Sequence, residues 1–202
     1  APGEELLVGA PPPGAPGRSY VYLGCGTKIV RAVVGAGTLG LLAVQVLRAH
    51  GARVLLVGRT ERRLPLGAEL GAHATWATSA GRLEETARSF SGREGVDLVV
   101  ETAGTAGAVQ HALDLVRPGG RVVLTGLPHE PTPVTFFSVV RREVTILGSM
   151  IYQNEFPEAL ALIRSGAVRT EPLLTHRFTL DAIDEAFAAH RDPASIKVAL
   201  VF

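Results

Sequence analysis

Two patterns of hydrophobic and polar positions alternate along residues 31–150. Short runs rich in valine and leucine are typical of strands that are buried on both faces of a sheet. Between them, longer stretches place apolar residues three or four positions apart, which predicts amphipathic helices. The predicted strands are a run ending at Val34 and the segments Arg53–Val57, Ala74–Ala77, Val96–Glu101, Arg121–Thr125 and Val144–Leu147.

The predicted helices alternate with these strands. They span Leu39–Ala49, Glu61–Leu70, Leu83–Phe90 and Ala106–Val116. Pro65 and Gly67 disfavour the middle of the second helix, and the run Arg117-Pro118-Gly119-Gly120 closes the last one. Strands separated by helices imply right-handed crossovers. We therefore predict an α/β fold with a doubly wound parallel sheet of about six strands.

A glycine-rich turn joins the first strand to the first helix. Gly35, Gly37 and Gly40 follow the spacing GxGxxG. In this spacing the first glycine permits the turn, the second lets the backbone approach a phosphate, and the third allows close packing of helix on strand. The free N–H groups of the helix N-terminus then face the anion. Such turns also occur without ligands, but the alternation that follows favours a Rossmann-type nucleotide site at the carboxyl ends of the strands.

Composition excludes several classes of function. Lys and Arg number 20 against 19 Asp and Glu in 202 residues, so no basic surface indicates a nucleic-acid partner. The uncharged stretch Ala32–Leu47 is too short and too rich in glycine to span a membrane. No charged and apolar leader precedes it, so we expect no membrane partner and a cytoplasmic location. Cys25 is the single cysteine, which excludes an internal disulfide and a multi-cysteine zinc site.

The length accommodates one substantial core with an accessory segment. We expect a Pro- and Gly-rich segment without assignment over residues 1–30. Residues 31–150 are predicted to form the nucleotide-binding domain, and residues 151–202 a tail of helix and strand.

The end of the second strand bears on the choice of nucleotide. A carboxylate at this place would bind the 2′-hydroxyl of an adenosine ribose, but Gly58 stands there. Arg59, Arg62 and Arg63 could instead neutralise a 2′-phosphate, which favours NADPH over NADH. Glu61 weakens this interpretation, and the arginines could equally lie on an exposed helix start.

Several ordered motifs between Val33 and the C-terminus resemble the medium-chain dehydrogenase/reductase superfamily. The motifs are Val34–Gly40, Glu69–Ala72, Gly95–Glu101 and Leu115–Val123. Three later runs look most like the zinc-dependent polyol and threonine dehydrogenase branch, namely Phe156–Leu160, Leu174–Phe178 and Glu185–Phe187. That branch oxidises secondary alcohols with NAD or NADP. The resemblance therefore implies the NAD(P)-binding part of an oxidoreductase that transfers hydride between a nicotinamide and an alcohol or carbonyl substrate.

The resemblance also implies roles for individual positions. Those matching the family's pyrophosphate turn are Gly35, Gly37, Thr38, Leu39 and Gly40. Those matching its adenosine ribose contacts are Gly58, Arg59 and Arg63. Those matching the wall beside the nicotinamide are Thr102, Ala103, Gly126, Leu127, Gly148 and Ser149. Lys197 matches a second pyrophosphate contact, although an exposed lysine beside a strand would look the same.

This chain departs from the family before Val33. Relatives carry there a domain of roughly 150 residues, a size typical of one domain, which supplies the catalytic zinc ligands and the proton relay. Residues 1–30 contain nothing that resembles those motifs, so we expect no zinc and assign no catalytic residue in this chain. The six histidines are interpreted as surface or structural residues. The chain is then a fragment, requires a partner for catalysis, or binds a cofactor without catalysis.

We also predict that the protein associates with a second copy of itself or with a partner that covers its tail. The resemblance implies a dimer that pairs along Val144–Leu147. Without its usual cover, the apolar segment Ile196–Phe202 would be an exposed strand, which favours self-association or a partner that covers the tail.

Two alternative functions remain open. One is an NADPH-binding regulatory module without chemistry. The other is an S-adenosylmethionine methyltransferase, because Leu23-Gly24-Cys25-Gly26-Thr27 also resembles a cofactor turn. Lys28 and the early arrival of the second glycine turn oppose the methyltransferase.

Overall fold

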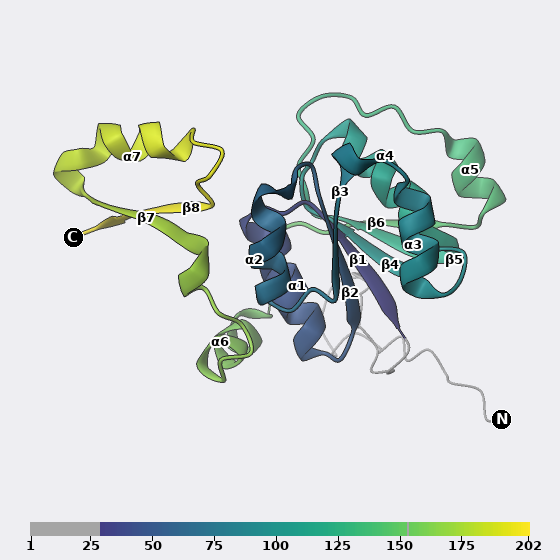
Figure 1. The fold of residues 1–202 in the computed structure, drawn as a ribbon, viewed down its shortest axis with the longest axis horizontal. Coiled ribbons are helices and arrows are strands. Elements are labelled where there is room, and N and C mark those ends of the chain that lie inside the picture. Colours follow the sequence, from purple (N-terminus) through teal and green to yellow (C-terminus); the bar gives the residue numbers. More distant parts are fainter. Residues whose placement is uncertain (1–28, 153) are drawn as a thin grey trace.

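The computed structural model describes residues 29–152 and 154–202. Its centre is a parallel sheet of six strands in the order β3-β2-β1-β4-β5-β6 (Figure 1). The strands are β1 Val30–Val34, β2 Arg53–Gly58, β3 Ala74–Ala77, β4 Val96–Glu101, β5 Val116–Leu124 and β6 Thr145–Gly148. The predicted α/β, doubly wound, six-stranded sheet is confirmed.

Helices cover both faces of this sheet (Figure 1). The helices α1 Thr38–Ala49 and α2 Leu64–Glu69 pack on one face. The helices α3 Leu83–Ser91 and α4 Ala106–Leu115 pack on the other. Successive strand residues point to opposite faces of the sheet. Val33 therefore packs in the core beside α1 and α2, while Ala32 and Val34 pack in the core beside α3 and α4. Burial on both sides explains the continuous apolar runs.

Two predicted boundaries are wrong in instructive ways. Residues 61–70 do not form one helix, because a 3₁₀ turn over Glu61–Arg63 precedes α2 and places Pro65 in its first turn, where the missing N–H costs nothing. The strand predicted to begin at Arg121 begins at Val116, directly after α4. Its pairing with β4 jumps from Val96↔Val116 to Leu98↔Arg121, so the intervening residues bulge out of the ladder.

A further helix was not predicted from the sequence. The segment Phe136–Arg141 forms α5 between β5 and β6. It is short, and no residue of it is fully buried, which explains why its apolar periodicity is weak.

The tail forms a small layer of its own beside α1 and α2 (Figure 1). It contains α6 Phe156–Arg164, β7 Leu174–Thr179, α7 Ile183–His190 and β8 Lys197–Val201. The strands β7 and β8 pair in parallel, and α7 packs on both. The expectation that Ile196–Phe202 is an exposed strand is corrected for its first part, because Ile196 packs against the α1 core and the middle of β8 is half-buried beside β7 and α7. It is confirmed for the end of the segment, where Val201 is 43% and Phe202 102% exposed.

A buried amide fastens the tail to the sheet domain. The Gln45 side chain, 3% exposed in α1, accepts a hydrogen bond from the Arg169 N–H at 2.7 Å and donates to the Arg169 carbonyl at 3.1 Å. The Arg169 guanidinium also pairs with Glu69 at 3.0 Å.

Among the described helices, none combines the length and apolar character that a membrane span requires.

Candidate functional site

Packing accounts for two of the three glycines in the turn between β1 and α1. Gly35 has φ +114°, which disfavours any side chain, and its N–H donates to the Val57 carbonyl at 2.8 Å. A Cβ on Gly40 would lie 1.8 Å from the Gly35 carbonyl oxygen. Both positions therefore need glycine for the helix to start directly on the strand.

Gly37 is different, because nothing in the described part of the protein requires it to be glycine. It is the N-cap of α1 with an ordinary backbone, φ −89° and ψ −173°. An added Cβ would have no described atom within 4 Å. The absent side chain thus leaves open space directly above the helix N-terminus.

That N-terminus also lacks a negative partner within the described residues. No side chain there caps α1, and its first turn contains no acid. The first N–H groups of a helix have no partner within it and carry the positive end of the helix dipole. An open, uncapped N-terminus above Gly37 fits a phosphate-sized anion, and Thr38 and Leu39 lie in this first turn.

The loop after β4 lies against the glycine turn. The Thr102 N–H and hydroxyl donate to the Val34 carbonyl at 2.9 and 3.0 Å, and the hydroxyl also reaches the Gly35 carbonyl at 3.3 Å. Thr102 and Ala103 are thus held beside the open space at the end of β1.

Glu101 joins the loops after β4 and β5, and sequence reasoning missed this role. Its carboxylate is fully buried, and Oε1 accepts from the N–H groups of Ala103 and Gly104 at 2.7 and 2.9 Å. Its backbone carbonyl accepts from the N–H groups of Thr125 and Gly126 at 2.9 and 3.1 Å. Oε2 has no hydrogen-bond partner in the structure. The available signal was an acid directly after the apolar run Leu98–Val100, at the end of β4.

The other residues predicted to lie beside the nicotinamide follow the carboxyl ends of β5 and β6. Gly126 approaches the β4 loop so closely that a Cβ would lie 2.2 Å from the Gly104 nitrogen. Leu127 follows it and is 57% exposed. Gly148 ends β6 in open space, and the Ser149 N–H donates to the Leu124 carbonyl at 2.9 Å. The structure thus brings the loops after β1, β4, β5 and β6 to one edge, as parallel strands require.

The three arginines after β2 do not act as a group. Gly58 ends β2 where a Cβ would be crowded, 2.9 Å from a Leu64 methyl group and 3.2 Å from the Thr60 carbonyl oxygen. Arg59 and Arg62 are exposed. Arg63 is half-buried and donates to the carbonyls of Pro193 and Ser195 in the tail. Its predicted contact with an adenosine ribose stays a prediction.

The tail returns to the glycine turn just before Lys197. The Thr38 hydroxyl, at the start of α1, donates to the Ile196 carbonyl at 3.1 Å. Lys197 is the next residue and its side chain is exposed. A residue far away in the sequence therefore reaches the first turn of α1.

His73 contacts the backbone of the sheet, and the described residues contain no group of side chains suited to a metal ion. The His73 Nδ1 accepts from the Val54 N–H at 2.9 Å. Burial lowers the pKa of His73 below its ordinary value of 6.5, and the nearby charges of Arg48 and Arg53 add to this. Within residues 29–152 and 154–202, no three His, Cys, Asp or Glu side chains are grouped to hold a metal ion. The described residues therefore do not fit the zinc of the family.

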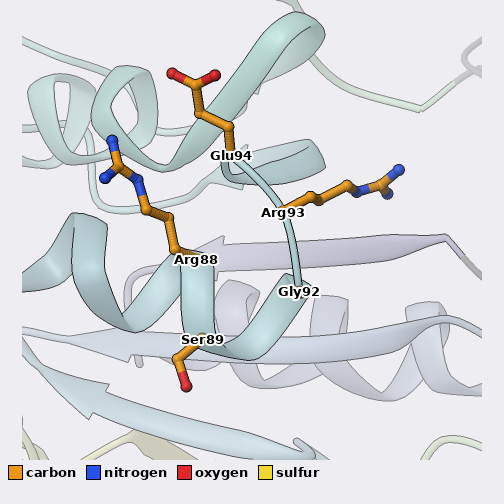
Figure 2. A pocket seen from close by; sticks show the side chains of 5 residues that line it. All are labelled: Arg88, Ser89, Gly92, Arg93 and Glu94. Carbon is orange, nitrogen blue, oxygen red and sulfur yellow. The ribbon is translucent and has the colours of Figure 1, made fainter.

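One hollow in the described structure lies away from these loops. It has a volume of about 660 Å³ and is lined by Arg88, Ser89, Gly92, Arg93 and Glu94 (Figure 2). These residues come from the end of α3 and the turn before β4. They therefore lie at the amino ends of the strands, whereas the glycine turn lies at the carboxyl ends. Arg93 is already paired with Asp97.

The motif Leu23–Thr27, which resembles the cofactor turn of a methyltransferase, lies outside the described residues.

Comparison with known proteins gives consistent matches over most of the chain. The family described as zinc-binding dehydrogenase matches residues 38–165. Human sorbitol dehydrogenase is 33% identical over 171 residues, which cover 83% of this chain and 48% of that protein.

Two solved structures have the same fold over a similar range. A Sinorhizobium meliloti protein described as a zinc-binding dehydrogenase, solved bound to NADP, superposes with a TM-score of 0.79 at 32% identity, covering 88% of this chain and 54% of that one. An alcohol dehydrogenase from Escherichia coli CFT073, complexed with NADH, superposes with a TM-score of 0.79 at 28% identity, covering 87% and 53%. The chain spans about half the length of the relatives it matches.

Proposed function

The chain belongs to the zinc-binding dehydrogenase family, the zinc-type branch of the medium-chain dehydrogenases, and we propose that it forms the nicotinamide-nucleotide-binding part of an oxidoreductase. The observation that carries this proposal is the open, uncapped N-terminus of α1 above Gly37. A pyrophosphate there would accept hydrogen bonds from the backbone of the turn formed by Gly35, Gly37, Thr38, Leu39 and Gly40. The Lys197 side chain, next to Ile196 at the same turn, would add a positive charge.

The adenosine end would lie beside the end of β2. Gly58 leaves no carboxylate for a ribose 2′-hydroxyl, while Arg59 and Arg62 are exposed next to it. Arginine binds phosphate with a planar, multiple-donor guanidinium. We therefore propose a preference for NADP over NAD.

The nicotinamide end would lie against the loops after β4, β5 and β6, where the wall residues are Thr102, Ala103, Gly126, Leu127, Gly148 and Ser149. Thr102 and Ala103 are held by hydrogen bonds to Val34 and Glu101, so this wall is preorganised. When bound, the nucleotide supplies the hydride chemistry. The names of the relatives support an alcohol or polyol, or the corresponding carbonyl compound, as substrate.

A non-catalytic NADPH-binding module remains the second candidate. Nucleotide binding without turnover would distinguish it from a dehydrogenase.

Self-association is part of the proposal. The strand β6 is an edge of the six-stranded sheet, and an unpaired edge is a template for another strand. A second copy that pairs there would extend the sheet across a dimer. Light scattering tests this, and a monomer across the accessible concentration range would contradict it.

Calorimetric titration with NADPH, NADH and ADP-ribose tests nucleotide binding. Gly37→Val should abolish binding of all three, because its side chain would fill the space above α1. The control is Gly107→Val, in the first turn of α4 and likewise in open space, which should bind like the wild type. The absence of wild-type binding would reject the proposed function, and equal binding by both variants would reject this site.

A further inference from the structure

We propose that Arg63 is a positioning residue that holds the segment 193–196 against the nucleotide site and thereby places Lys197, and that it does not read the adenosine 2′-phosphate. This inference rests on the proposed nucleotide site. One guanidinium nitrogen of Arg63, Nη2, donates to the Pro193 carbonyl at 3.0 Å and to the Ser195 carbonyl.

The segment that Arg63 holds is an ordered turn rather than a free tail. The Ser195 N–H donates to the Asp192 carbonyl at 2.9 Å, and the Ala194 N–H donates to the Asp192 carboxylate at 2.7 Å. Ser195 itself is only 5% exposed. The Ile196 N–H donates to the Thr175 hydroxyl at 3.1 Å.

Two parts of the nucleotide-binding domain reach this turn. Arg63, from the loop after β2, binds the carbonyls of residues 193 and 195. Thr38, from the first turn of α1, binds the carbonyl of Ile196. The backbone is therefore held on both sides immediately before Lys197, so the start of that side chain is placed at the α1 N-terminus.

The same contacts oppose a role in nucleotide discrimination. Turning Nη2 of Arg63 toward a 2′-phosphate would leave the Pro193 and Ser195 carbonyls without their charged donor, and hydrogen bonds to charged groups are the stronger kind. Arg59 and Arg62 are exposed and can approach a phosphate without such a loss. Discrimination between NADPH and NADH then falls to these two residues.

The two roles predict different patterns of affinity. Lys197 would act on the pyrophosphate, which NADPH and NADH share. Removing Arg63 should therefore weaken both nucleotides by the same factor, roughly tenfold, as expected for the loss of one charge-assisted contact. Removing Arg59 should weaken NADPH alone.

Titration of matched methionine variants separates these patterns. We expect Arg63→Met to leave the ratio of NADPH to NADH affinity unchanged and Arg59→Met to lower it. The double variant of Arg63 and Lys197 should bind no more weakly than Lys197→Met, because both substitutions remove one contact. A changed ratio in Arg63→Met, or fully additive losses in the double variant, would overturn the proposal.

A measurement without nucleotide keeps the proposal independent of the proposed function. Hydrogen exchange of the Ser195 and Ile196 amides should accelerate in Arg63→Met and stay at the wild-type rate in Arg59→Met. Unchanged exchange in Arg63→Met would refute the contact as a restraint, even if nucleotide binds. Accelerated exchange in a protein that binds no nucleotide would support the restraint and reject only the nucleotide site.

Discussion

Replacing Glu101 with alanine removes the carboxylate on which the loop after β4 is built. Its Oε1 accepts two backbone hydrogen bonds at 2.7 and 2.9 Å in a fully buried position. Hydrogen bonds to a charged acceptor contribute about 1.5–3 kcal/mol each. Oε2 has no hydrogen-bond partner among the residues that the structure describes, so the carboxylate is incompletely compensated for its burial and its removal offsets part of that loss. We expect the free energy of unfolding to fall by about 2–4 kcal/mol.

Glu101→Gln is the matched control for the charge. It keeps an acceptor oxygen for the N–H groups of Ala103 and Gly104 but loses the charge, so we expect a smaller loss of about 1 kcal/mol. Urea denaturation monitored by circular dichroism gives both values from the midpoint and slope. If the alanine variant proves as stable as the glutamine variant, the two backbone hydrogen bonds do not stabilise the loop as reasoned.

Three other predictions concern parts of the fold that position the site. The folded pKa of His73 lies below its ordinary value, so the folded chain binds fewer protons than the unfolded chain below about pH 6.5 and loses stability as the pH falls. Acidification from about pH 8 to about pH 5 should therefore lower the Tm of the wild type more than that of His73→Asn, which keeps an acceptor; equal changes would contradict this. Gly40→Ala should cost at least about 1–3 kcal/mol, because its Cβ would lie 1.8 Å from a carbonyl oxygen. Gly107→Ala, in open space within α4, should melt at or slightly above the wild-type temperature, because alanine favours a helix more than glycine does. Gln45→Leu leaves both backbone groups of Arg169 without their partner and should lower the free energy of unfolding by about 1–3 kcal/mol. Thermal melting measures this loss, and proteolysis of the tail should become faster. An unchanged cleavage rate would show that the Gln45 amide does not anchor the tail.

The elements of the sheet could be predicted from sequence because their signals are local. The segments Ala74–Ala77 and Val96–Glu101 coincide with β3 and β4, since strands of a parallel sheet are short, mostly apolar runs. The start of β5 was missed because it depends on a distant partner. The bulge there carries Arg117, whose side chain donates to Asp97 at 2.8 Å, a contact that no local pattern reveals.

For the candidate site, the sequence by itself determined the position of the glycine turn and which loops follow the parallel strands. These follow from spacing and strand order, because carboxyl ends of parallel strands share one edge. Only the tertiary structure decided that Gly37 faces open space, that Glu101 joins two loops, and that Arg63 holds residues 193 and 195. Each of these depends on which atoms a side chain meets after packing, and residues 130 positions apart in the sequence, such as Arg63 and Pro193, become neighbours only when the tail docks against the folded sheet domain.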